Sequence, residues 1–333
     1  MRRAGLTLLA LVAFVAVAAP WLAPNPPEQT FSDLLYAPPT GIHVGSGLSS
    51  GSGLSALGFG TYVHPTRLVS RLERRFEEDQ SVRVPIDVFS RGRLVSVDDT
   101  KGGPLLILGA DAFGRDIFSR LLYGSRTSLA LAVLATLGAL LIGAAVGGIA
   151  GYAGGLVDEL LSRFSDFILV LPAIYVALAL RAVMPLVLPA STVFVVLTGI
   201  FALMGWPIVA RGVRAIIASE RERDYAMAGV ALGAGHTRLL LRHLLPAARG
   251  YLAVQATLLL PAFILAEATL SYVGLGFPDT LPTWGTMLQD ASNVALVGDA
   301  PWTLAPAAAI FVLVLAVNLT VQGVGRAPVQ LEP

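Results

Sequence analysis

Only a few residues in the apolar part of this sequence could do chemistry. Glu267 and Arg181 are ionisable groups inside predicted membrane spans, where such groups are functional candidates by default. Because both should lie toward the outer membrane face, where charged side chains reach water or pair, we favour anchoring and keep a pathway or gating role for Glu267 as the alternative. An alternative from another class, an intramembrane hydrolase, would use Ser271 as its nucleophile and would need a histidine beside it. All four histidines fall in polar segments: His43, His64, His236 and His243.

Other catalytic and cofactor patterns are missing from the sequence. It contains no cysteine, which excludes disulfides, a thiolate metal site and a cysteine nucleophile. Lys101 is the only lysine and precedes Gly102, so the phosphate-binding pattern GxxxxGK[ST] cannot occur, and GxGxxG is also absent. We therefore expect no catalytic residue, no metal and no cofactor on this chain. If ATP drives its activity, another chain binds the ATP and its Mg.

The composition belongs to a polytopic membrane protein. Of the 333 residues, 55% are hydrophobic and 14% are charged, and the mean hydropathy is +0.72. A net charge of +1 argues against a nucleic-acid binder. A channel is also disfavoured, because no ring of like charges recurs along one face of a span.

Six apolar stretches are long enough to cross about 30 Å of hydrocarbon as helices. They cover Leu6–Leu22, Leu129–Tyr152, Phe164–Met184, Leu186–Arg211, Leu252–Tyr272 and Thr303–Val321. The first could instead be a cleaved signal peptide, since Ala16-Val17-Ala18 resembles a cleavage site, but its length favours a retained helix. We predict an all-α polytopic membrane protein with six transmembrane helices.

Glycines and prolines mark these predicted spans. Four glycines recur every four residues and form a ridge that lets another helix approach closely: Gly143, Gly147, Gly151 and Gly155. Three prolines are predicted to kink their helices, which could serve gating: Pro172, Pro261 and Pro306.

A long polar excursion follows the first span, and we predict a small α/β insert within it. Leu68, Leu72 and Phe76 recur every four residues, which fits an amphipathic helix. Between residues 82 and 97 apolar residues alternate with polar ones around a turn at Ser90-Arg91-Gly92, which predicts a β-hairpin. Pro85 would place its strand at a sheet edge.

The predicted organisation has four parts. They are the first transmembrane helix (1–22), the insert with an interfacial helix (23–123), a core of five spans with a polar loop at 212–250 (124–322), and a tail (323–333).

The most charged segment after the insert runs from Ser219 to Pro246, so it should lie in water between spans. Ser219 and Glu222 read as a capping box, and Gly233-Ala234-Gly235 supplies a stop. This predicts one helix of about 13 residues, roughly 20 Å long. A second short helix should begin at Thr237 and end before Pro246.

This segment resembles the cytoplasmic EAA loop of ABC-transporter permease subunits, in which Glu-Ala-Ala is followed by Gly and then by Leu-Pro. The register falls on Met227-Ala228-Gly229, Gly233 and Leu245-Pro246. Met227 and Gly229 depart from the pattern, so no role of the family's carboxylate transfers. The resemblance implies a helix that docks on a separate ATPase subunit, and the residues expected to face it are Asp224, Tyr225, Met227, Ala228, Gly229, Leu232, Gly233, Leu245 and Pro246.

A second stretch, ILGADAFGRDIFSRLLYGSRTS from Ile107, is similar to the second permease of dipeptide and oligopeptide importers. For Asp111, Arg115 and Asp116 we favour capping and pairing at an interfacial helix over ligand binding. The resemblance implies a homologous second permease, two ATPase subunits, an extracytoplasmic solute-binding protein and the bilayer as partners, with no nucleic acid. The solute would be a di- or oligopeptide; close relatives carry nickel or other small solutes.

Charge asymmetry predicts the orientation in the membrane. Residues 211–249 hold seven arginines against three acids, whereas residues 23–120 are net acidic by one. The positive-inside rule therefore puts the 212–250 loop in the cytoplasm and the insert outside. Six spans in the bacterial inner membrane, with both ends cytoplasmic, satisfy both placements.

Overall fold

The computed structural model describes residues 2–46, 59–70, 74–90, 92–97, 103–183, 185, 188–292 and 294–322. Two compact units make up the chain. One, the helical unit, comprises Met1–Leu6, Ala130–Gly276 and Ala316–Pro333. The other, the insert unit, comprises Thr7–Leu129 and Phe277–Leu315. Each is described by itself below.

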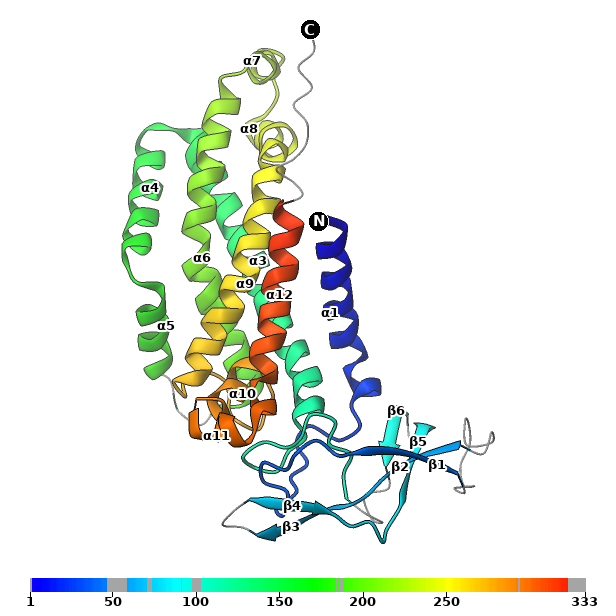
Figure 1. The fold of residues 1–333 in the computed structure, drawn as a ribbon. Coiled ribbons are helices and arrows are strands. Elements are labelled where there is room, and N and C mark those ends of the chain that lie inside the picture. Colours follow the sequence, from blue (N-terminus) through cyan, green and yellow to red (C-terminus); the bar gives the residue numbers. More distant parts are fainter. Residues whose placement is uncertain are drawn as a thin grey trace. The chain divides into compact units, whose positions relative to one another are not determined.

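The α-helices are labelled in Figure 1. They are α1 (Arg2–Leu22), α3 (Ile117–Ala153), α4 (Gly155–Val170), α5 (Ala173–Ala182), α6 (Ala190–Arg221), α7 (Asp224–Ala231), α8 (His236–Leu239), α9 (Arg249–Tyr272), α10 (Trp284–Asp290), α11 (Val294–Asp299) and α12 (Ala305–Gln322). A π-turn (Leu240–Leu244) and a 3-10 turn (Leu245–Ala248) join α8 to α9, and a 3-10 turn (Pro301–Leu304) precedes α12.

Five helices in the described part of the chain are long and apolar enough to span a membrane: α1, α3, α6, the continuous α8–α9 segment and α12 with its preceding turn. A sixth span exists if α4 and α5 count as one, although they are bent by 82° relative to each other. The prediction of six spans is thus confirmed in part, with five continuous spans and a sixth only if the broken α4–α5 pair is counted as one. The predicted span over Phe164–Met184 is interrupted by more than the kink expected at Pro172, because the chain is extended at Leu171 and Pro172, and proline has no N–H to continue the helix.

The glycine ridge packs α3 against α6 in the helical unit. A Cβ on Gly143 would lie 2.5 Å from Cβ of Val209, one on Gly147 would overlap the backbone of Ala210, and one on Gly151 would lie 2.5 Å from the carbonyl oxygen of Arg214. Those three positions confirm the close approach. Gly155 does not belong to the ridge, because it begins α4 with φ +55° and has open space around it.

The three prolines act differently from one another. Pro172 stands immediately before α5 and ends the preceding helix rather than kinking it. Pro261 lies inside α9, and the kink predicted there stays a prediction. Pro306 is the second residue of α12, where no intrahelical hydrogen bond is lost, so the predicted kink there is wrong.

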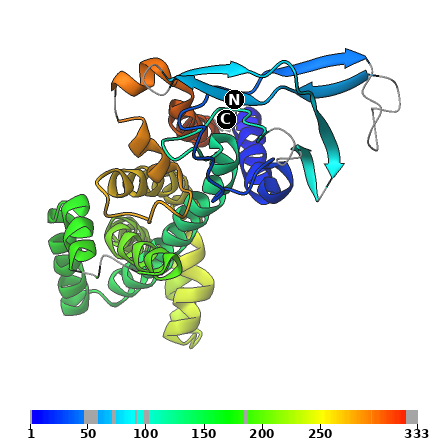
Figure 2. The ribbon, with the colours of Figure 1, turned by 90° about the horizontal axis from the view of Figure 1, so that it is seen from below.

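The insert is built from strands, as Figure 1 shows. They are β1 (Ile42–Ser46), β2 (Phe59–Val63), β3 (Thr66–Ser70), β4 (Arg75–Glu78), β5 (Val84–Ser90) and β6 (Arg93–Val97). Four of them form an antiparallel sheet in the order β1-β2-β5-β6, and β3 pairs with β4. The paired β1 and β2 appear as a long two-stranded arm in Figure 2.

The β-hairpin predicted over residues 82–97 is confirmed as β5–β6, with Gly92 at φ +74° in the turn. The predicted amphipathic helix is wrong: Leu68 in β3 pairs with Phe76 in β4, and Leu72 lies outside the described residues. No helix occurs in the described residues between α1 and α3, so the α part of the α/β insert is not confirmed.

Two further details concern Pro85, in this unit, and α3, of which only the first residues belong to it. Pro85 does not lie in an edge strand, because β5 is flanked by β2 and β6. Residues 84–85 of β5 pair with β2, and β5 pairs with β6 from Ile86 onward. The missing N–H of Pro85 therefore lies where the pairing changes from one neighbouring strand to the other. Helix α3 runs for 37 residues without a break, which joins the predicted interfacial helix to the span after it.

Candidate functional site

The helix predicted to begin at Ser219 is shorter than the sequence predicts and begins later. Ser219 does not cap it, because α6 continues to Arg221 with Val213 and Ile217 fully buried on its inner face. Glu222 is the C-cap of α6, and its N–H donates to the carbonyl of Ser219, so the capping box is wrong. After this turn α7 comprises Asp224–Ala231, with Asp224 in its first turn, where the helix dipole favours an acid.

The end of α7 is fixed by two backbone hydrogen bonds around Gly233. Gly233 N–H donates to the carbonyl of Val230 at 2.9 Å, and Ala234 N–H donates to that of Gly229 at 3.0 Å. This is the Schellman arrangement, which requires a left-handed residue, and Gly233 has φ +80°. The predicted glycine stop is confirmed.

The second helix of the segment starts one residue before its predicted start. Helix α8 begins at His236 and winds through π and 3-10 turns into α9, so the predicted end before Pro246 is wrong. Pro246 sits in the first turn of the 3-10 segment, where its missing N–H costs little. Leu244 is fully buried, Leu245 half-buried and Pro246 exposed.

Several apolar side chains of α7 and its C-cap are uncovered. Ala226 is buried and a Cβ on Gly229 would touch Leu239 at 3.3 Å, so these two face the rest of the unit. The residues we call the α7 surface are exposed and apolar: Tyr225, Met227, Val230 and Leu232, at 43%, 54%, 55% and 89%. Asp224 and Ala228 are exposed as well. A hollow of about 640 Å³ adjoins this surface, lined by Tyr152, Ala153, Arg221, Met227, Val230, His236 and Leu239.

Polar contacts hold α7 and α8 to the neighbouring helix ends. Arg221 Nη1 donates to the carbonyl of Tyr152 at 2.8 Å, and the Tyr152 hydroxyl lies 2.6 Å from Nδ1 of His236. The Tyr225 hydroxyl donates to Glu220 Oε2 at 2.7 Å. Removal from water, together with that bond, raises the pKa of Tyr225, so its hydroxyl stays a donor. Sequence reasoning missed Tyr152 and His236, because no local pattern links two positions that are 84 residues apart. It also left out Val230, although this residue lies inside the predicted helix.

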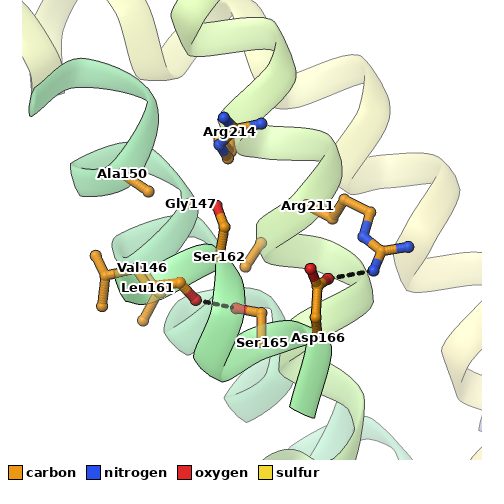
Figure 3. Close-up of a pocket in the computed structure, with 10 residues that line it drawn as sticks. Val146, Gly147, Ala150, Leu161, Ser162, Ser165, Asp166, Arg211 and Arg214 are labelled. Carbon is orange, nitrogen blue, oxygen red and sulfur yellow. Dashed lines mark hydrogen bonds and ion pairs between the residues drawn. The ribbon is translucent and has the colours of Figure 1, made fainter. Parts of the chain in front are cut away.

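A second cavity, of about 210 Å³, lies between α3, α4 and α6 (Figure 3). Arg214 forms a two-bond ion pair with Asp158, and Arg211 Nη2 lies 2.5 Å from Asp166 Oδ1. Ser165 donates to the carbonyl of Leu161 at 2.8 Å. Since each charge here already has a partner, the cavity offers no free nucleophile or cation.

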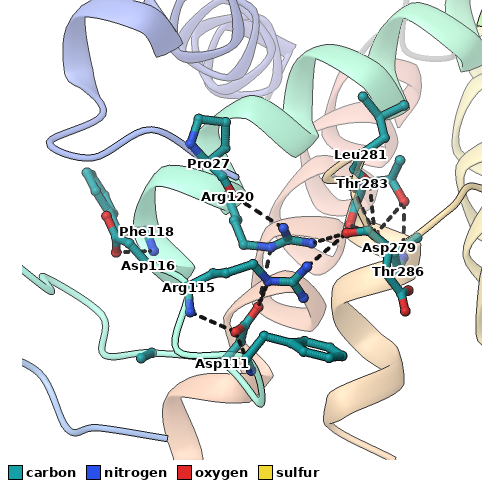
Figure 4. Close-up of polar contacts among 12 residues, drawn as sticks. Pro27, Asp111, Arg115, Asp116, Phe118, Arg120, Asp279, Leu281, Thr283 and Thr286 are labelled. Atoms are coloured by element: carbon teal, nitrogen blue, oxygen red, sulfur yellow. Dashed lines mark hydrogen bonds and ion pairs between the residues drawn. The ribbon is translucent and has the colours of Figure 1, made fainter. Parts of the chain in front are cut away.

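The insert unit contains a buried charge cluster, shown in Figure 4. Asp111 Oδ2 lies 2.7 Å from Arg115 Nε and 3.5 Å from Arg120 Nε. Both arginines donate to the carbonyl of Asp279, at 3.0 and 3.2 Å, and Arg120 also donates to that of Pro27 at 3.3 Å. We call Asp111, Arg115 and Arg120 with these two carbonyls the Arg120 cluster. It confirms pairing for Asp111 and Arg115.

Asp116 caps α3, as predicted. Its Oδ1 accepts from the N–H of Phe118 at 3.0 Å, and its Oδ2 accepts from Ser119 Oγ at 2.5 Å and from Asn25 Nδ2 at 3.0 Å. Asn25 also donates to the carbonyl of Leu105 at 2.7 Å. A bound ligand is not needed to explain any of these buried groups.

Glu267 and Ser271 face each other inside α9. Glu267 is fully buried, and Ser271 Oγ donates to its Oε1 at 2.7 Å. The serine therefore contacts a carboxylate one turn away and not a histidine, which removes the geometric basis for a hydrolase. Pro261 lies in the same helix, on the N-terminal side of this pair.

A class of protein follows from these observations. The helical unit belongs to a multi-pass membrane protein that presents a short helix with exposed apolar side chains on a loop between two spans. A family model described as binding-protein-dependent transport system inner membrane component matches residues 139–327. Another, the N-terminal TM domain of oligopeptide transport permease C, matches residues 1–39. The chain belongs to the family of inner membrane components of binding-protein-dependent transport systems.

Similar curated proteins include three permeases. The dipeptide transport system permease protein DppC of Alkalihalophilus pseudofirmus is 38% identical over 65% of this chain and 68% of its own length. The oligopeptide transport system permease protein OppC of Bacillus subtilis is 37% identical over 65% and 68%. The di/tripeptide transport system permease protein DppC of Pseudomonas aeruginosa is 30% identical over 96% and 84%. The chain is thus a transport subunit of an ABC importer and not itself an enzyme.

Proposed function

We propose that this chain is one of two permease subunits of an ATP-driven importer of di- or oligopeptides. The names of its relatives support the solute class, since the three permeases above are named for dipeptides, oligopeptides and di/tripeptides. The chain pairs with a homologous permease, receives solute from an extracytoplasmic binding protein and releases it into the cytoplasm. Two ATPase subunits bind ATP and Mg.

The observation that carries this proposal is the α7 surface. A helix of eight residues is too short to be stable alone, and its exposed apolar side chains gain free energy only when a partner covers them. We infer that an ATPase subunit covers α7. Closure of the two ATPase subunits then draws the α7 helices together and moves the attached spans between inward- and outward-open states.

Arginine asymmetry supports the orientation of the chain in the cytoplasmic membrane, with both ends inside. Because the chain has no cysteine, single cysteines at Ser90 and Ala234 can report on it. We expect a membrane-impermeant maleimide added to intact spheroplasts to label the first site and to label the second only after lysis. Labelling of both in intact spheroplasts would overturn this topology.

Peptide transport itself is tested in proteoliposomes that contain the complete complex and its binding protein. ATP-dependent uptake of a radiolabelled dipeptide supports the proposal, and uptake of Ni²⁺ with no peptide uptake would favour the alternative of a nickel or other small-solute importer. Glu267 and Pro261 are the pathway and gating candidates, since a buried carboxylate and a proline share α9.

A further inference from the structure

One buried cation in the helical unit lacks the partners that this chain gives its other buried cations. Arg181 lies in the last turn of α5 and is 4% exposed. Its Nη1 donates to the carbonyl of Pro185 at 3.3 Å, a long and weak bond. Its Nε is buried with no hydrogen-bond acceptor. Within the part of the chain that the structure describes, no carboxylate pairs with Arg181.

The Arg120 cluster shows what a satisfied buried arginine looks like in the same chain. Arg120 has a carboxylate and two carbonyl oxygens around it. Desolvating a guanidinium costs several kcal/mol, which only a counter-charge and further hydrogen bonds offset. Arg120 thus has the partners that offset its burial, whereas Arg181 has one weak hydrogen bond and no counter-charge. This difference suggests that the guanidinium of Arg181 has a role other than stabilising the fold.

The surroundings of Arg181 are those of a broken span. Helix α5 has ten residues, about 15 Å, which is half of a membrane crossing. It is separated from α4 by the 82° bend at Leu171–Pro172. Short, proline-interrupted spans are where secondary transporters place their substrate sites, because a break lets a segment move and frees polar groups.

We propose that Arg181 binds a carboxylate of the solute during its passage through the membrane. This rests on the proposed peptide function and names the group that is recognised. Every linear peptide with a free C-terminus carries that carboxylate whatever its side chains are. The planar guanidinium can hold a carboxylate through two parallel N–H···O bonds, and the free Nε–H is one of the donors for such a pair. Movement of α5 about the break would bring the guanidinium to the solute.

The test compares a dipeptide with its C-terminal amide in the reconstituted complex. Binding of each to the solute-binding protein is measured separately, so that the comparison between variants isolates the membrane step. One variant is Arg181→Met, which keeps a long side chain but removes its charge. The other is Arg181→Lys, which keeps the charge but removes the planar pair of N–H donors. Arg163→Met is the matched control, because Arg163 is 76% exposed and pairs with Glu159 at the surface.

We expect Arg181→Met to assemble at wild-type level, because it removes an unpaired buried charge. It should lower uptake of the free acid at least tenfold and leave uptake of the amide unchanged, so that the acid-to-amide ratio falls. Arg181→Lys should keep part of the preference for the free acid over the amide, and Arg163→Met should keep all of it.

Two results would overturn the inference. One is an acid-to-amide ratio that Arg181→Met leaves at the wild-type value. The other is loss of assembled complex in Arg181→Met, which would make Arg181 a structural residue. If the wild-type complex transports neither peptide, the proposed function fails instead, so the two failures are distinguishable.

Discussion

The Arg120 cluster and the α7 surface differ in which kinds of side chain they bury and which they leave exposed. The cluster gathers charged residues, buries them and gives each a partner: Asp111 is 4% exposed, and Arg120 2%. The α7 surface gathers apolar residues and leaves them in the open: Leu232 is 89% exposed and Met227 54%. The protein thus buries charged groups, whose burial costs free energy, and leaves exposed the apolar groups, whose burial would be favourable.

That contrast teaches where to look for function in this molecule. Charged residues stand out in the sequence, yet those of the cluster already have ion-pair and hydrogen-bond partners within the insert unit and stabilise its fold. The apolar residues of α7 look ordinary in the sequence, yet they are the unsatisfied ones. At α7, exposed apolar surface rather than charge marks the place where we propose that a partner binds.

The first prediction breaks the cluster and has the largest expected effect. Asp111→Ala leaves Arg115 and Arg120 buried without their carboxylate, which should destabilise the insert unit by about 3–5 kcal/mol. We expect little folded protein in the membrane, measured by detergent-solubilised yield and thermal unfolding. Glu159→Ala is the control, because its pair with Arg163 is exposed and contributes about 0–1 kcal/mol. Equal yields of the two variants would contradict a structural role.

The second prediction concerns a substitution that should distort the end of α7 without changing any side chain of the α7 surface. Gly233→Val puts a β-branched residue at φ +80°, at a cost of about 1–2 kcal/mol or more, which should fray the end of α7. The spans should insert normally while co-purification of the ATPase subunits and uptake fall. Gly235→Ala is the control, since Gly235 has φ −64° and open space around it. Full ATPase retention and transport in Gly233→Val would refute this account.

Sequence patterns predicted the spans and local caps, because these depend on neighbours along the chain. The glycine ridge, the Gly233 stop and the cap at Asp116 are of this kind. The contacts of Arg115 and Arg120 with Asp279 span 164 and 159 residues, which no local pattern encodes.

The errors have equally local causes. A spacing of four residues is close to one helical turn and is also twice the strand period, so Leu68 and Phe76 fitted a helix although they pair across a hairpin. Ser219 and Glu222 have the spacing of a capping box, but the buried Val213 and Ile217 carry α6 past them. Tertiary burial decided the outcome where local signals were ambiguous.

The third prediction removes one apolar side chain from the α7 surface. Leu232→Ser should change the free energy of unfolding by no more than about 0.5 kcal/mol, because this side chain is 89% exposed. ATPase binding should weaken several-fold, since a covered leucine contributes about 1.5–3 kcal/mol when fully buried and less at a rim. Titration of purified ATPase measures this, with Val69→Ser in β3 as an exposed control. Unchanged affinity would remove Leu232 from the interface.

The last prediction tests how completely the Arg120 cluster is satisfied. Burial and the nearby carboxylate of Asp111 raise the pKa of Asp290 to about 6, against the lowering effect of Arg115 and Arg120. An acid with a raised pKa holds its proton more tightly in the folded state than in the unfolded one, where the pKa is about 3.9. Its contribution to stability is therefore present below about pH 4 and lost as the pH rises to about 6.

The loss should be on the order of 1 kcal/mol once solvent screening of this half-buried group is allowed for. We expect Asp290→Asn to flatten the decline of the thermal unfolding midpoint between pH 4 and 6. Asp279→Asn is the matched control, because the two arginines bind the backbone carbonyl of Asp279 and not its exposed side chain. If Asp290→Asn keeps the wild-type slope, the two arginines already neutralise Asp290, and the cluster extends to a second carboxylate.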